Sequence, residues 1–226
     1  MQFAARNYSG DFTMIKKEII EQEVKRRGIR HLVHFTKSGN FNSILEQGLI
    51  TRDRISRENI EHICNDQLRL DRTNGICLSV SFPNYKMLYS YRMKFPSISW
   101  IILGVSPEIL WKKDCLFHHT NAASRSAQDV PKHQKLGDFG FKSLFSDESA
   151  NRASLEIPEN YSTDPQAEII VCETIEAEYI TAYAVSSAEH SQSMTRSFPG
   201  KNFQVVDKFF SPRKDYAYWQ KNKEEL

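Results

Sequence analysis

Apolar and polar positions alternate along the chain in a way that predicts a mixture of helices and strands. Residues 15–27 carry apolar side chains at helical spacing, and Gly28 stops the pattern. The segment HLVHFT at 31–36 alternates as a strand does, and NFNSILEQG after it has the spacing of a short helix that ends at Gly48. A helix, a strand and a second helix are therefore expected at the start of the chain.

The remaining pattern predicts further strands joined by irregular connections. The strongest strand signals are 75–82 and 97–105, with a helix over 84–95 between them. Later strands are expected at 166–175, 177–185 and 204–210, and shorter helices at 107–111, 140–145 and 187–197. Strands without regular β-α-β alternation favour an α+β fold. No repeat and no linker divides the sequence, so we expect residues 1–226 to form a single domain.

Two polar stretches interrupt this pattern. Residues 51–75 are charged and weakly periodic, with a helical part at 55–68, and predict a long excursion over the surface. Residues 146–164 are acidic, contain Pro158 and Asn160 and have few apolar side chains, which predicts a mobile loop. Both stretches are candidates for function because binding residues concentrate on such loops.

Composition narrows the class of protein. The 226 residues are 40% hydrophobic and 26% charged, enough for a compact core. No run of about eighteen apolar residues occurs, and the N-terminus lacks the basic and apolar regions of a signal peptide. We therefore expect a soluble cytoplasmic protein with no membrane partner. The four cysteines form no C-x-x-C pair, which favours buried thiols over a metal site.

Charge is balanced in total but unevenly distributed. The net charge of +2 does not by itself indicate a nucleic-acid partner. Residues 16–57 contain ten basic and five acidic residues, whereas residues 144–178 contain one basic and nine acidic residues. We expect opposite potentials over the two regions, although solvated helix faces explain the basic one equally well.

Candidate chemistry is scattered rather than concentrated in a common motif. The sequence has no G-x-x-x-x-G-K-[ST], G-x-G-x-x-G, H-E-x-x-H or G-x-S-x-G. His118 and His119 are adjacent, and neighbours on a strand point to opposite faces, so they make a poor joint metal site. What remains are polar residues beside predicted strands: HFT at 34–36, the arginines of QLRLDR, and QAE at 166–168.

These residues resemble the DarT family, bacterial toxins with an ADP-ribosyltransferase fold that modify bases of single-stranded DNA. The matching pieces are LVHFTKSGNFNSILEQGLI, ICLSVSFPNYKMLYSYR, and QAEIIV followed by EYI, over roughly residues 31–185. FPNYKMLY is more similar to the guanine-modifying branch than to the thymine-modifying one. The resemblance implies an α+β fold with the split antiparallel β-sheets of mono-ADP-ribosyltransferases and peripheral helices. It also implies NAD as a consumed co-substrate, no metal, and a macrodomain antitoxin as partner.

The resemblance places NAD along the strand that holds His34 and Thr36. Taken alone, His34 is equally a core histidine and Thr36 a helix-capping hydroxyl. An arginine is expected to reach the NAD phosphates or to hold the acceptor, because a planar guanidinium binds two oxygens at once. Of Arg69 and Arg72 we favour Arg69, as a catalytic and NAD-binding residue. Tyr85 is assigned to NAD by stacking on the nicotinamide. Its aromatic neighbours are explained more simply as core residues: Phe82, Tyr89 and Tyr91.

Glu168 is the catalytic residue that the resemblance implies. Cleavage of the bond between ribose and nicotinamide builds positive charge on the sugar, which a fixed carboxylate stabilises. The same carboxylate is suited to accept the proton that an amine of the acceptor base sheds. Gln166, two residues earlier on the predicted strand, shares its face and addresses the acceptor base. Without the resemblance, QAE is an ordinary polar start of an edge strand.

Acceptor recognition is assigned to residues that follow the central strands. The candidates are Gln166, His119, Asn121 and Arg92, with Arg125 and Lys86 as further contacts. The loop at 146–164 corresponds to the acceptor-recognition loop of such transferases. Its acidity departs from the expectation, because it repels phosphates unless arginines screen it.

Two alternatives stay open at this point. An RNA acceptor fits the same mechanism, since stacking on a splayed base does not distinguish the sugars. A catalytically silent domain that binds nucleic acid or an antitoxin on the same scaffold is the second alternative, and intact His34, Gln166 and Glu168 speak against it.

Overall fold

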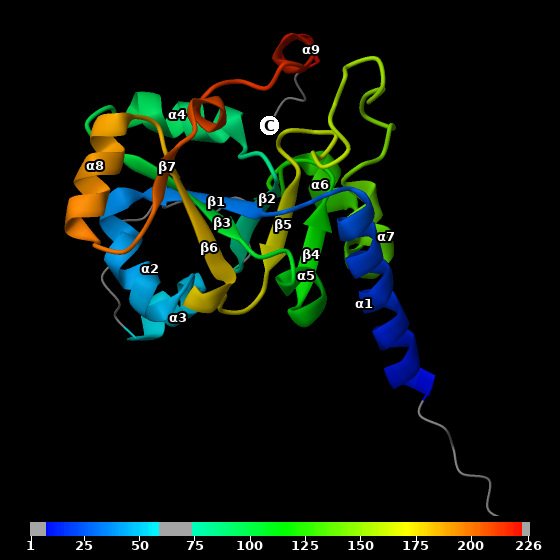
Figure 1. Cartoon of the computed structure of the whole chain (residues 1–226). Coiled ribbons are helices and arrows are strands. Elements are labelled where there is room, and N and C mark those ends of the chain that lie inside the picture. Colours follow the sequence, from blue (N-terminus) through cyan, green and yellow to red (C-terminus); the bar gives the residue numbers. More distant parts are fainter. Residues whose placement is uncertain (1–7, 59–73, 223–226) are drawn as a thin grey trace, which may run out of the picture.

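The computed structural model describes residues 8–58 and 74–222, with side chains from residue 17 onward. Its strands form a seven-stranded sheet in the order β4-β5-β2-β1-β3-β6-β7 (Figure 1). The strands are β1 (Leu32–Lys37), β2 (Ile76–Val80), β3 (Trp100–Val105), β4 (Cys115–His118), β5 (Glu168–Val171), β6 (Ile180–Val185) and β7 (Phe203–Val205). The helices around it are α1 (Tyr8–Arg26), α2 (Phe41–Gln47), α3 (Arg52–Glu58), α4 (Tyr85–Lys94), α5 (Ile109–Lys112), α6 (Arg125–Asp129), α7 (Gly137–Ser143), α8 (Ala188–Ser197) and α9 (Tyr216–Lys221).

The sheet is divided between β1 and β2. β1 pairs with β3 over six residues, but its pairing with β2 covers Leu32 and Val33, opposite Val80 and Ser79. The two strands separate beyond that point, which gives the split sheet that the family resemblance implies. One strand departs from the expected antiparallel arrangement, because β7 pairs parallel to β6 at the edge.

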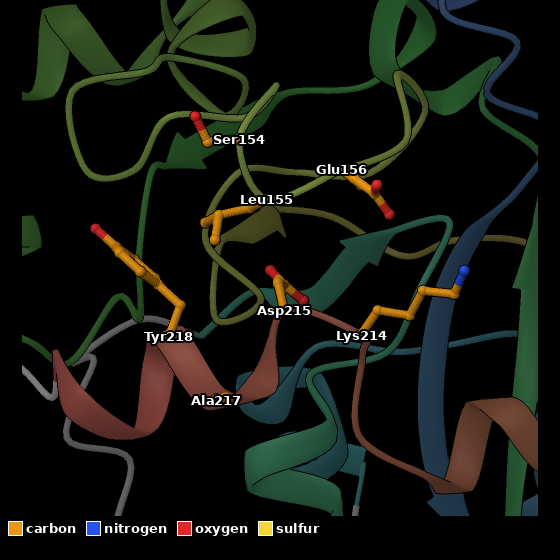
Figure 2. Close-up of a pocket in the computed structure, with 7 residues that line it drawn as sticks. All are labelled: Ser154, Leu155, Glu156, Lys214, Asp215, Ala217 and Tyr218. Carbon is orange, nitrogen blue, oxygen red and sulfur yellow. The ribbon is translucent and has the colours of Figure 1, made fainter.

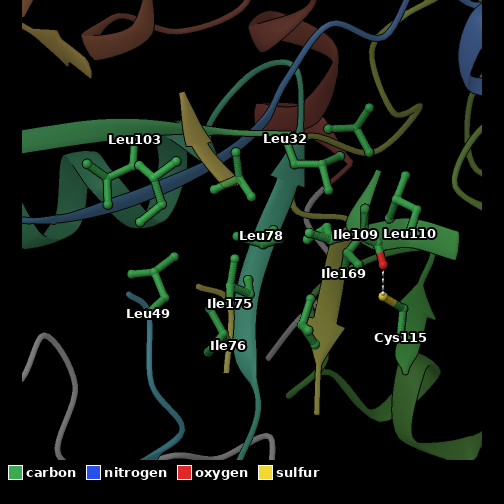
Figure 3. Close-up of a cluster of buried hydrophobic side chains, with 14 of the residues drawn as sticks. Leu32, Leu49, Ile76, Leu78, Leu103, Ile109, Leu110, Cys115, Ile169 and Ile175 are labelled. Atoms are coloured by element: carbon green, nitrogen blue, oxygen red, sulfur yellow. Dashed lines mark hydrogen bonds between the residues drawn. The ribbon is translucent and has the colours of Figure 1, made fainter. Parts of the chain in front are cut away.

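The main hydrophobic core lies against one face of this sheet. Strand residues such as Leu32, Leu78, Leu103 and Ile169 are at most 2% exposed and pack together (Figure 3). Burying each such side chain contributes about 1.5–3 kcal/mol to folding. A smaller cluster on the other face joins Val33 of β1 to Leu88 of α4, so α4 covers that side.

Most predicted elements are present, and the differences concern boundaries and short segments. α1 begins at Tyr8 rather than at residue 15, and the late helix α8 is confirmed. β4, α6 and α9 come from segments for which the pattern predicted no element. At the end of α2, Gly48 has a φ of 76°, and an added Cβ there would meet the carbonyl oxygen of Ile175. This close approach explains why the helix stops at a glycine.

The cysteines only partly follow the prediction of buried thiols. Cys115 is buried, and burial raises its pKa to about 12, in accord with its contact to the Ile109 carbonyl (Figure 3). Cys172 is exposed, so the prediction was wrong for that residue, which lies just past the end of β5. Cys64 lies outside the described residues. Within the described ranges, no helix is long and apolar enough to cross a bilayer.

Candidate active site

Several strand ends meet at one edge of the sheet, below α9 and the loop 146–164 in Figure 1. β4 ends there at His118, which pairs with Glu168 at the start of β5. On its other side β5 pairs with β2, whose last residues also reach this edge. Connections from β4, β5 and β2 therefore leave the sheet close together, and Glu168 stands between them.

Glu168 is held in place by the turn that follows β4. Its side chain is buried, and Oε2 accepts a hydrogen bond of 3.3 Å from the backbone N–H of Ala122. Asn121 shapes this turn, because its Oδ1 accepts from the Ala123 N–H at 2.8 Å and its carbonyl accepts from the Ser124 N–H at 2.9 Å. Asn121 therefore presents a backbone donor to the carboxylate, a role that the sequence did not suggest.

Strand alternation places Glu168 on the face that α4 covers. Paired residues on neighbouring strands share a face, and every second residue returns to it. The set that includes Glu168 runs across the sheet through Ile170, Cys77, Ser79 and Val33. Val33 belongs to the cluster with Leu88 of α4, so the carboxylate and α4 lie on the same side.

His34 lies near this edge but not beside Glu168. It pairs with Leu103, whose side chain belongs to the main core, so its side chain starts from the opposite face. Its Nδ1 lies 2.9 Å from the carbonyl oxygen of Cys77, at the place where β1 and β2 separate. β2 intervenes between the two residues, which puts their strands about 10 Å apart.

Thr36 does not act as a helix cap. Its hydroxyl oxygen accepts a hydrogen bond of 3.0 Å from the side chain of Asn40, and the 3₁₀ turn that follows has no side-chain cap. Thr36 is buried on β1, two residues beyond His34. The interpretation of Thr36 as a helix cap is therefore wrong, and its role in binding NAD stays a prediction.

The segment after β2 carries polar groups that sequence reasoning mostly missed. Ser81 has a φ of 58°, in the left-handed region that favours glycine, and such strain often marks functional sites. Asn84 caps α4, since its Oδ1 accepts from the Met87 N–H, while its Nδ2 has no hydrogen-bond partner. The hydroxyl of Tyr85, at the first residue of α4, is also buried without a partner. Burial, and next the charge of Asp215, raise the Tyr85 pKa.

Gln166 lies in a turn rather than on β5. Its backbone N–H donates to Oδ1 of Asp164 at 2.7 Å, and β5 starts at Glu168. The inference that strand alternation makes the two side chains share a face is therefore wrong. Asp164, which the sequence did not single out, is buried and fixes this turn, and burial raises its pKa.

The other proposed acceptor contacts are spread around this edge. His119 follows β4 directly and is half-buried, and Arg125 is exposed at the start of α6. Arg92 on α4 donates to the carbonyl of Phe210 at 2.8 Å, and Lys86 donates to the carbonyl of Trp219 at 3.3 Å. Arg92 and Lys86 therefore contact the C-terminal segment.

Two further predictions concern the arginine expected at the site and the absence of a metal. Arg69 and Arg72 lie outside the described residues. Among the residues that are described, no group of three or more His, Cys, Asp or Glu side chains is arranged to hold a metal ion.

The loop 146–164 contains neither helix nor strand, but buried groups hold it. Arg152, 9% exposed, donates to the carbonyls of Tyr161 and Pro158 and to the hydroxyl of Thr163, at 2.9–3.0 Å. The loop predicted to be mobile is thus braced from within. Against the C-terminal segment it borders a pocket of about 260 Å³, lined from the loop by Ser154, Leu155 and Glu156 and from that segment by Lys214, Asp215, Ala217 and Tyr218 (Figure 2).

Part of the acidity of this region is neutralised. Glu159 lies 3.2 Å from the guanidinium of Arg27, at the end of α1, and 3.9 Å from that of Arg26. Asp164 and Glu168 are buried. Neighbouring arginines therefore screen the loop in part, as its predicted role requires.

Solved structures share this architecture. Thermosipho africanus DarTG in complex with ADP-ribose aligns with a TM-score of 0.59 and 21% identity, over 80% of this chain and 51% of that one. Thermus sp. 2.9 DarT aligns at 15% identity over 81% of this chain, with TM-scores of 0.53 in complex with ADP-ribosylated ssDNA and 0.51 with carba-NAD+. These alignments cover 97% and 98% of the Thermus chain. The chain therefore shares the fold of these DarT structures.

The sequence comparison is more specific. The family model described as "ssDNA thymidine ADP-ribosyltransferase, DarT" matches residues 33–214, and the chain belongs to this family. Membership confirms the predicted resemblance and the predicted enzyme class. Enzymes of this class use NAD as a co-substrate, in agreement with the carba-NAD+ complex of the Thermus relative. Among curated proteins no match is found.

Proposed function

We propose that this chain is the toxin of a toxin–antitoxin system that transfers ADP-ribose from NAD to guanine in single-stranded DNA. The observation that carries the proposal is the buried carboxylate of Glu168, fixed by a backbone N–H at the edge where the connections of three strands meet. Residues 1–226 act as one domain in this proposal, and residues 146–164 form its acceptor loop.

In the proposed reaction the bond between C1′ of the ribose and the nicotinamide nitrogen breaks, and nicotinamide leaves with the electron pair. Glu168 stabilises the positive charge on the sugar, and a base amine then forms the new bond to C1′. The proton that this amine loses passes to the carboxylate. A buried carboxylate suits both the stabilisation of the sugar and the acceptance of the proton, because interactions between charges are stronger in the protein interior than in water.

NAD is proposed to lie where β1 separates from β2, with His34 and Thr36 on β1 and Tyr85 on α4. The buried hydroxyl of Tyr85 without a partner supports this assignment, since a polar ligand would supply one. Arg69 is proposed for the NAD phosphates. The acceptor base is assigned to Gln166, His119, Asn121 and Arg92.

The choice of guanine rests on the segment FPNYKMLY, and the description of the family model names thymidine. The deciding experiment incubates the protein with labelled NAD and short oligonucleotides that each contain one base type, as DNA and as RNA. Label on dG oligonucleotides supports the proposal, label on dT ones moves the enzyme to the thymidine-specific branch, and label on RNA alone replaces DNA. No transfer by folded protein would favour the silent binding domain.

The antitoxin and the compartment complete the proposal. A toxin that modifies the DNA of its own cell needs a partner that reverses the modification, and we propose a macrodomain hydrolase. Release of labelled ADP-ribose from the modified oligonucleotide by such a hydrolase would support this. We place the reaction in the cytoplasm because NAD and DNA are both available there.

A further inference from the structure

The C-terminal segment around Arg213 is tied to the end of the loop 146–164. The Arg213 side chain is 4% exposed, and its guanidinium donates to the carbonyl oxygens of Ser162 and Thr163, each at 2.9 Å. A single planar group thus holds two successive peptide units of the loop, which an ammonium group does not do with the same geometry.

Arg213 is in turn oriented by a buried partner. Its Nε donates to Oδ1 of Asp215 at 2.9 Å, and its NH2 group donates to Oδ2. Trp219 of α9 donates its indole N–H to Oδ2 of the same carboxylate at 2.7 Å. Both ionic side chains are 4% exposed, so the pair is complete and shielded from water. We call Arg213, Asp215 and Trp219 the C-terminal tie.

The tie reaches the proposed acceptor site through a short path. Thr163 is followed by Asp164, whose Oδ1 accepts the backbone N–H of Gln166 and whose carbonyl accepts that of Ala167. Glu168 comes next. Any shift of the two carbonyls held by Arg213 therefore moves the turn that carries Gln166.

The tie also reaches α4. Lys86 donates to the carbonyl of Trp219, and the ring of Tyr161 in the loop lies 5.3 Å from that of Phe82 just before α4. The tie thus joins the acceptor loop to the segment that carries Tyr85.

We infer that Arg213, oriented by Asp215 and Trp219, is a positioning residue that sets the acceptor loop and Gln166 over the reacting sugar, and so controls use of the base rather than binding of NAD. The inference rests on the proposed function. It assigns a function to the C-terminal segment around Arg213, in which the sequence pattern alone shows only charged residues.

The test compares Arg213→Lys and Trp219→Phe with the wild-type enzyme, and Arg196→Lys on the exposed part of α8 is the matched control. We expect Arg213→Lys to raise the KM for the oligonucleotide about tenfold, because one ammonium replaces a fork that holds two carbonyls. The dissociation constant for carba-NAD+ should stay near wild type, whereas the thermal midpoint should fall, because buried carbonyl oxygens lose hydrogen bonds. Hydrogen exchange at residues 158–167 should be faster. Trp219→Phe keeps an aromatic ring and should give the same pattern, more weakly.

An unchanged KM for the oligonucleotide in Arg213→Lys would overturn the inference. A parallel loss of carba-NAD+ binding in both variants would do so as well, since it would mean a general structural role. If Arg213→Lys does not fold, the KM of Trp219→Phe decides between these outcomes. Failure of the proposed function looks different, because the wild-type enzyme itself would then transfer nothing to any oligonucleotide.

Discussion

Replacing Glu168 by glutamine removes the charge and keeps the shape of the side chain. The amide oxygen of the new side chain would still accept the Ala122 N–H, which at 3.3 Å is a long hydrogen bond worth about 1 kcal/mol. The free energy of unfolding should therefore change by less than about 1 kcal/mol. The transition state, in contrast, loses a fixed negative charge beside the developing positive sugar.

The loss of such electrostatic stabilisation typically costs about 2.7–4 kcal/mol, or about 10²–10³ in rate. The assay measures transfer of labelled ADP-ribose to the preferred oligonucleotide under saturating NAD, together with thermal unfolding of each variant. Glu178→Gln, at an exposed glutamate before β6, is the matched control and should keep the wild-type rate.

Two results would refute the reasoning. A Glu168→Gln rate within about threefold of wild type, less than about 1 kcal/mol in the barrier, would show that the charge is not used. A large fall in thermal midpoint together with the loss of activity would show that Glu168 supports the fold instead.

Three further predictions concern stability. Gly48→Ala should lower the free energy of unfolding by about 1–3 kcal/mol in urea titration, because φ is +76° and the Cβ meets the Ile175 carbonyl; an unchanged midpoint would contradict this. Arg152→Met should cost about 2–4 kcal/mol, because three buried acceptors in the loop lose their donor, and proteolysis within 146–164 should become faster. Hydrogen bonding from Arg26 lowers the pKa of Glu23 from 4.5 to about 2, so Glu23 stabilises the fold above pH 4.5 and this contribution is lost as the pH falls toward 2. Glu23→Gln should remove that acid-dependent part, about 1 kcal/mol, and a variant with the wild-type acid profile would count against it.

The sequence could predict those helices, strands and caps that are determined by their own residues. β3 is buried at every position, and its apolar run, three of whose six residues are β-branched, indicates a central strand without knowledge of its neighbours. The same holds for the strand that starts near Glu168. Asn84 could have been found as the cap of α4 from its residue type and position alone.

What the sequence could not supply depends on distant contacts. Gln166 was expected on a strand, but the side chain of Asp164 takes its N–H and makes a turn. β7 joins β6 in parallel, which no periodicity reveals. Arg213 and Asp215 stand in a charged tail, and a pattern of charge alone favours solvent exposure; the burial of Arg213 follows from carbonyls some fifty positions earlier in the chain.

The contacts that hold the loop 146–164 come from both flanks of the chain. Arg27, just after α1, holds Glu159 from one side, and Trp219 of α9 completes the hold of Arg213 from the other, while the family model spans residues 33–214. Trimming the enzyme to that shared span would keep Glu168 and remove both supports. Under the proposed function, exchanging the flanks between relatives is a route to redirect the choice of acceptor while the strand that carries Glu168 stays as it is.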